Sequence, residues 1–276
     1  MKSIFDLENR LDITNEFEKL IYAFYEDDNA VVYEEDAYTP STYASLMEVI
    51  GKRVFLKWKY RDTFLNVEEY LEHIGIDYER VLTYGNHHIE RQNFLYFIEF
   101  IANMTWLFKL EPKIELSNKA KAYIENIPRI LEKMNYTLKE LDDKVIITKR
   151  NSDVDTILTK VPDNIAHLLL EYNDFRISDD IKAKKAILKA IDLYLDEDNK
   201  RIKKQIRGID SALVDTFETI LNNMGINHQN EKEVFTSISD EEKNEWYDKC
   251  FLLMIHGIRA IDVNEIKKER AELLKK

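Results

Sequence analysis

The chain has 276 residues, a formal net charge of −12, 33% charged and 11% aromatic residues, and only 6 Gly and 4 Pro. The aromatic content excludes a disordered chain, because large side chains supply the buried surface that offsets the entropy lost on ordering. So few turn-forming residues favour long helices over sheets. A single cysteine, Cys250, excludes an internal disulfide framework and a cysteine-based zinc site.

The N-terminus, MKSIFDLENRLDITNEF, lacks the apolar core of a secretion signal. No stretch of about 18 consecutive apolar residues occurs, so we expect no contact with a membrane. We therefore predict a cytoplasmic protein. The negative charge disfavours broad affinity for nucleic acid, which is itself a polyanion, but it leaves room for a local basic patch.

Hydrophobic periodicity predicts a helical N-terminal region. An almost wholly apolar run near residues 89–110 indicates a buried central helix. Residues 54–60, VFLKWKY, could form a short strand or the end of a helix. The helices predicted in this region cover residues 15–25, a stretch starting at Thr39-Pro40-Ser41, residues 66–73 with Asn66 as the cap, and residues 89–110.

A β-hairpin is the one convincing strand signal. Residues 136–141 and 144–149 are short β-prone runs, and Asp142-Asp143 forms a plausible two-residue turn between them. An isolated hairpin is marginal in water, so we expect this one to pack on helices. The helix before it is predicted from Ser117 to Met134, with a kink or break at Pro128.

The region after the hairpin is predicted to be helical to its end. Gly225 is a good left-handed stop for one helix, and Ser239 with Glu242 forms a capping box for the next. The fold class is therefore all-α with one small β-hairpin near residues 136–149 and a C-terminal helical bundle. We predict two regions, 1–115 and 116–276.

Common catalytic motifs are absent from the sequence. There is no glycine-rich phosphate loop, dinucleotide fingerprint, nucleophile elbow, HExxH motif or Ca²⁺ loop, so we predict no metal and no cofactor. His167 and His256 are predicted to lie inside apolar helical faces as structural residues.

A basic stretch over residues 182–207 is the clearest local exception to the acidic composition. One interpretation is an RNA-binding surface, and the other is the solvated faces of two helices. The residues that the first interpretation assigns to RNA contacts are Lys184, Lys185, Arg201 and Lys204.

Residues 222–230 read NNMGINHQN. They resemble the Asn-Asn-x-x-Ile-Arg-His-x-Asn signature near the C-terminus of bacterial abortive-infection-type proteins with a HEPN-like helical domain. The segments IKAKKAILKAIDLYLD, NSDVDTI and EWYDKCFLLMIHGIRAI also resemble that group, so the likeness extends over residues 118–262. It implies a helical bundle, a homodimer, a role in phage defence and, in some members, metal-independent RNA cleavage.

In the active members of that group an Arg and a His act together on RNA. His228, Asn230 and Asn223 match the signature, but Asn227 stands where the signature has Arg, so the expected cation is missing. Arg80 and His87 provide an Arg–His pair with six residues between them, outside the similar region. Another interpretation of NNMGINHQN is a loop tied down by its own polar side chains.

Two functions follow from these observations. The first is an abortive-infection-type protein that cleaves or binds RNA. The second is a non-catalytic inhibitor or immunity-type protein, whose acidic segments at residues 26–28 and 34–36 bind a basic protein partner.

Overall fold

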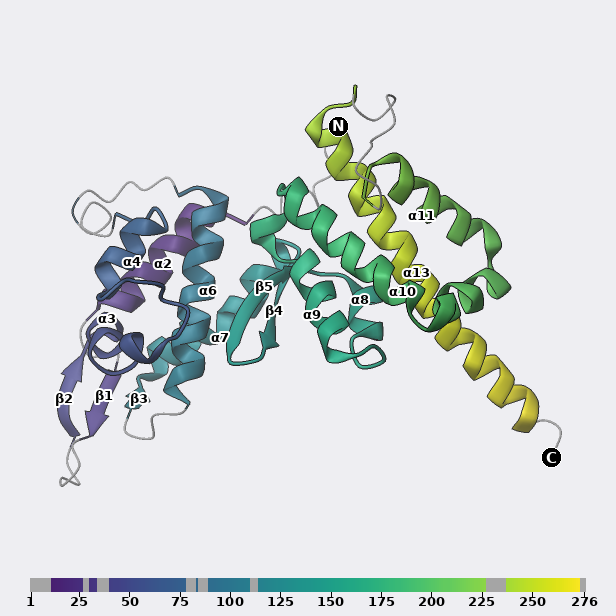
Figure 1. Cartoon of the computed structure of the whole chain (residues 1–276). Coiled ribbons are helices and arrows are strands. Elements are labelled where there is room, and N and C mark those ends of the chain that lie inside the picture. Colours follow the sequence, from purple (N-terminus) through teal and green to yellow (C-terminus); the bar gives the residue numbers. More distant parts are fainter. Residues whose placement is uncertain are drawn as a thin grey trace, which may run out of the picture. The chain divides into compact units, whose positions relative to one another are not determined.

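A computed structural model of the chain describes residues 11–26, 30–33, 40–77, 83, 89–109, 114–226 and 237–273. The chain forms two compact units, Met1–Ile147 and Thr148–Lys276. Most described residues are helical (Figure 1), which confirms the predicted fold class. The boundary between the two units follows residue 147, whereas the predicted boundary followed residue 115. The helix and most of the hairpin between these positions contact the first unit.

The N-terminal unit is built around one buried helix, α6 (Arg91–Phe108), as its apolar sequence predicts. It lies beside α2 (Ile13–Tyr25) and α7 (Asn118–Lys133), as Figure 1 shows. The smaller helices are α3 (Leu46–Val49), a π-helical turn (Ile50–Val54), a 3₁₀ turn (Phe55–Lys57) and α4 (Val67–His73). The predicted cap Asn66 is confirmed, since its Oδ1 accepts a hydrogen bond from Glu69 N. Ser117, the predicted start of a helix, is the N-cap of α7, and its Oγ accepts from Ala120 N. Pro128 lies inside α7 without ending it.

A three-stranded antiparallel sheet in this unit was not predicted. Its strands have the order β2 (Pro40–Ala44), β1 (Ala30–Tyr33) and β3 (Ile114–Leu116). The helix predicted to start at Thr39-Pro40-Ser41 is therefore wrong. Ser45 is the actual cap, accepting a hydrogen bond from Glu48 N, because residues 40–44 are already paired with β1.

The hairpin forms as predicted, from β4 (Tyr136–Leu141) and β5 (Lys144–Lys149). Side chains of α6 hydrogen bond to the backbone of β5. The Asn103 amide accepts from Val145 N at 2.9 Å and donates to Val145 O at 2.7 Å, and Glu99 Oε2 accepts from Ile147 N at 2.8 Å. Residues 145 and 147 are two positions apart in the strand, so all three bonds lie on the same edge of β5. These side chains take the place of a neighbouring strand.

The C-terminal unit is a helical bundle in which α10 (Ile181–Ile209), α11 (Ser211–Asn223) and α13 (Asp240–Leu273) pack on one another. The basic stretch lies within the single element α10, which bends between residues 192 and 203, because Lys203 contacts Asp192. Shorter elements are α8 (Ser152–Ile157), α9 (Asp163–Tyr172) and a 3₁₀ turn (Phe175–Ile177). The predicted capping box is present, with hydrogen bonds from Glu242 N to Ser239 Oγ and from Ser239 N to Glu242 Oε2. Gly225 follows α11 with φ of 63°.

Replacement of Asn103 by Ala should lower the free energy of unfolding of the N-terminal unit by about 2 to 4 kcal/mol, because two buried backbone groups of Val145 lose their partner. Urea denaturation and amide hydrogen exchange of residues 144–149 measure the effect. Asn118→Ala, at an exposed position on α7, is the control. Equal stability of the two variants would show that the hairpin does not depend on the Asn103 amide.

Candidate functional site

The residues predicted to be catalytic are only partly described by the structure. Arg80, His87, His228 and Asn230 lie outside the described residues. Asn223 is the last residue of α11, and it lines a surface depression of about 530 Å³ together with Trp246 of α13. Asn223 therefore lies beside the exposed ring of Trp246. Among the described residues, no histidine or arginine lines this depression with it.

Lys184 is not part of an exposed basic surface. Its side chain is 1% exposed, and Nζ donates to Asn244 Oδ1 and to Asp248 Oδ1, each at 2.7 Å. The Tyr172 hydroxyl donates to the same Asp248 oxygen at 2.9 Å. Burial lowers the pKa of Lys184, although the hydrogen bond and charge of Asp248 oppose that shift. This cation joins α9, α10 and α13, so its assignment to RNA binding is wrong.

The other cations of α10 divide into buried and exposed groups. Lys203 is 3% exposed and lies 2.6 Å from Asp192 and 3.0 Å from Asp196. Burial alone would lower the pKa of Lys203, but these two carboxylates outweigh it and raise the pKa. Arg201 and Lys204 are exposed, and Lys185 is half-buried. Arg201 and Lys204 therefore remain the predicted RNA contacts that solvent reaches freely.

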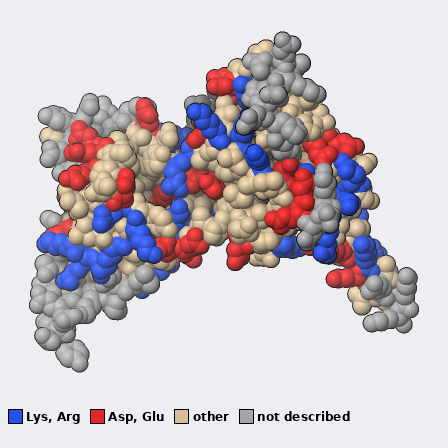
Figure 2. Space-filling view, viewed as in Figure 1, with Lys and Arg blue, Asp and Glu red and all other residues tan. Residues whose placement is uncertain are grey.

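A denser group of exposed cations lies in the N-terminal unit. It consists of Lys52, Arg53, Lys57 and Lys59, which follow α3 directly. Figure 2 shows Lys and Arg side chains gathered over the lower part of this unit, in contrast to the acidic composition of the chain. Lys52 pairs with Glu48 and Lys59 with Asp143, so part of this charge is compensated.

A histidine, an aspartate and an arginine come together in the C-terminal unit. His256 Nε2 lies 3.2 Å from Asp153 Oδ2, and the Arg259 guanidinium bonds the other carboxylate oxygen, Asp153 Oδ1. Asn151 caps α8 and fixes the start of the helix that carries Asp153. His256 and Arg259 are neighbours on one face of α13, three residues apart. We refer to these three side chains as the Asp153 cluster.

The Asp153 cluster is open to solvent. The side chains of His256 and Arg259 are 51% and 46% exposed, so the prediction that His256 lies in an apolar face is wrong. Both residues line a surface groove of about 380 Å³. The rest of its lining comes from the end of α10 and from α13, namely Ile209, Ala260, Val263, Asn264 and Lys267.

The cluster provides the groups needed for acid–base chemistry on an anionic substrate. An exposed imidazole held by a carboxylate can accept or donate a proton, and Arg259 and Lys267 supply positive charge along the groove. The sequence contains a weak signal for it, because Asp153 lies in NSDVDTI and His256 and Arg259 in EWYDKCFLLMIHGIRAI. Their contact across 103 residues of sequence could not be predicted from periodicity.

Cys250 does not provide a nucleophile. Its side chain is buried, and burial raises the pKa of the thiol to about 12. Within the described parts of the chain, no group of three or more His, Cys, Asp or Glu side chains is placed to hold a metal ion. The helices described here include none with the length and apolar character needed to cross a membrane.

Comparisons of the chain with protein-family models, with curated proteins and with solved structures found no match.

Lys184→Ala should lower the free energy of unfolding of the C-terminal unit by about 2 kcal/mol or more, because Asn244 and Asp248 lose a buried donor. Lys204→Ala, at an exposed position on the same helix, should change it by less than about 0.5 kcal/mol. Urea denaturation of the two full-length variants makes the comparison. Equal stability would show that the bonds of Lys184 contribute nothing net.

Proposed function

We propose that this chain is an abortive-infection-type phage-defence protein whose C-terminal unit cleaves RNA without a metal ion, with the Asp153 cluster as the catalytic site. The Asp153 cluster is the observation that supports this most directly, because His256 and Arg259 line an open groove and Asp153 contacts both of them. The resemblance of residues 118–262 to HEPN-like proteins supports the same class of reaction.

The proposed reaction uses the ribose 2′-hydroxyl as the nucleophile. His256 accepts the hydroxyl proton, the 2′ oxygen bonds to phosphorus, and the bond from phosphorus to the 5′ oxygen breaks. The protonated imidazole then returns the proton to the leaving 5′ oxygen. Arg259 and Lys267 stabilise negative charge that develops on the phosphate, while Asp153 keeps the imidazole oriented.

A homodimer is part of the same proposal. It was expected from the resemblance, and α13 carries apolar side chains that would support it. Val263, Ile266 and Leu273 on the last turns of this helix are 41%, 56% and 70% exposed. Exposed apolar side chains on one helix are candidates for a contact between copies of the chain.

The non-catalytic interaction protein is the second candidate. The observation that favours it is the burial of Lys184 and Lys203 in pairs with carboxylates, together with the net charge of −12. In this case the acidic segments at residues 26–28 and 34–36, of which only Glu26 is among the described residues, would bind a basic protein. The Asp153 cluster would then be an ion pair that ties α8 to α13.

Cleavage of RNA by the purified full-length protein in the presence of EDTA should fall about a hundredfold or more in His256→Gln. The substrate is a single-stranded RNA, and the same sequence with 2′-O-methyl groups should remain intact because it has no free nucleophile. Induction in bacterial cells, followed by growth and by electrophoresis of total RNA, gives the cellular measurement.

His73→Gln is the matched control, since His73 is an exposed histidine on α4 of the other unit. His87→Ala and His228→Ala test the two sites predicted from the sequence in the same assay. A loss of cleavage in either of these variants, with full activity in His256→Gln, would move the catalytic site away from the Asp153 cluster. Intact RNA with the wild-type protein would favour the interaction protein.

A further inference from the structure

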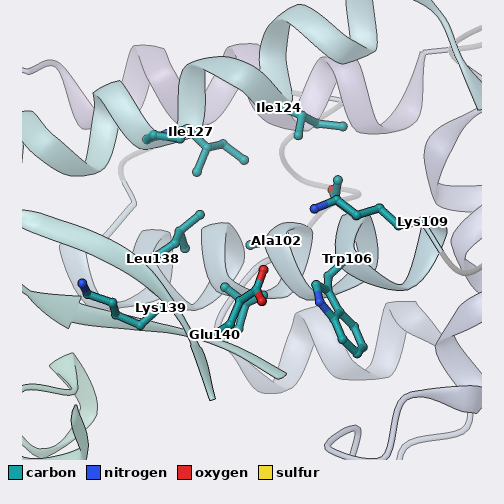
Figure 3. A pocket seen from close by; sticks show the side chains of 11 residues that line it. Ala102, Trp106, Lys109, Ile124, Ile127, Leu138, Lys139 and Glu140 are labelled. Carbon is teal, nitrogen blue, oxygen red and sulfur yellow. The ribbon is translucent and has the colours of Figure 1, made fainter. Parts of the chain in front are cut away.

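The N-terminal unit contains a pocket that the proposed RNA chemistry does not use. It has a volume of about 320 Å³ and lies where α6, α7 and the hairpin meet. Figure 3 shows Ile127 of α7 and Leu138 of β4 pointing into the same space, with Ala102 of α6 near Leu138. Trp106 lines the pocket farther along α6. The other lining residues are Thr105, Lys109, Ile124, Pro128, Lys139, Glu140 and Val145.

The walls of this pocket are held in place by the fold. The wall formed by α6 is joined to the wall formed by the hairpin through the hydrogen bonds of Asn103 with Val145 and of Glu99 with Ile147. The third wall, α7, is a continuous helix through Pro128. A pocket built from such fixed elements exists before a ligand binds, which lowers the entropy cost of binding.

The polar side chains in the otherwise apolar lining are Thr105, Lys109, Lys139 and Glu140, and the two lysines outnumber the one carboxylate. Proline has no backbone N–H, so Pro128 cannot bond the carbonyl of Ile124 one turn earlier, and both residues line the pocket. This carbonyl therefore lacks its usual helical donor, and it could accept a hydrogen bond from a ligand that reaches it. Lys109 is the C-cap of α6 and is exposed at the pocket, where its ammonium group can pair with an anion.

We propose that this pocket binds a small aromatic anion that carries a hydrogen-bond donor. The flat apolar body would lie against Trp106, Ile127 and Leu138. The donor would bond the Ile124 carbonyl, and the anionic group would pair with Lys109. The volume lies near the lower limit for ligand pockets, which are about 300 to 1,000 Å³, so the ligand is one of fragment size.

Anilinonaphthalenesulfonate is a suitable probe, because it combines a flat apolar body, an N–H donor and a negative charge. Its fluorescence on titration with the full-length protein should saturate at a single class of site, and naphthoic acid should displace it. Lys109→Glu should weaken binding of naphthoate about tenfold but leave the affinity for uncharged naphthamide nearly unchanged.

Lys133→Glu is the matched control, because Lys133 also ends a helix and is exposed. Ala102→Leu, which fills the pocket, should abolish binding of both naphthoate and naphthamide. If Ala102→Leu fails to fold, the comparison of Lys109 with Lys133 still decides the outcome. The proposal is overturned if the probe does not saturate, or if naphthoate binds the Lys109 and Lys133 variants equally.

Discussion

The amide of Asn103 is the interaction on which the N-terminal unit depends most. A two-stranded hairpin leaves the backbone groups of its outer edge unpaired, and buried groups without partners cost free energy. In this protein the outer edge of β5 faces α6, where Asn103 and Glu99 lie one turn apart and bond residues 145 and 147. These hydrogen bonds let the helix α6 take the position of a third strand. Two buried polar side chains of α6, which would be unfavourable alone, therefore fix the hairpin register.

The C-terminal unit uses buried lysines in a related way. Lys184 and Lys203 are each almost fully buried and paired with carboxylates from α10 or its neighbours. Removing an ammonium group from water is costly unless charged or polar partners replace the water. The pair of Lys184 with Asp248 thus requires α13 to sit at one position along α10. Apolar packing alone would tolerate more sliding between two such long helices.

Local sequence signals predicted much of the fold, but they did not predict contacts between residues that are far apart in the chain. Asn66 and the Ser239–Glu242 pair were identified as caps, and Ser117 as the start of a helix, because a cap depends on residues three positions apart. The sheet of β1, β2 and β3 was missed because β3 lies far along the chain from β1, and Pro40 resembles the start of a helix. The Asp153 cluster was missed for the same reason. Lys184 was misassigned because a basic run in sequence does not show which cations face inward.

The separation of buried from exposed cations also bears on how an acidic protein could bind RNA. Counterion release depends on cations that reach phosphate, so Lys184 and Lys203 add nothing to it. The exposed cations instead form small local groups. One is the group of Lys52, Arg53, Lys57 and Lys59 after α3, and another is Arg259 with Lys267 along the groove of α13. A few cations beside a fixed histidine suit a site that acts on one phosphate. They suit a long duplex poorly, because the surrounding carboxylates would repel its remaining charge. The charge pattern therefore favours a short single-stranded segment over duplex RNA as the substrate of the proposed site.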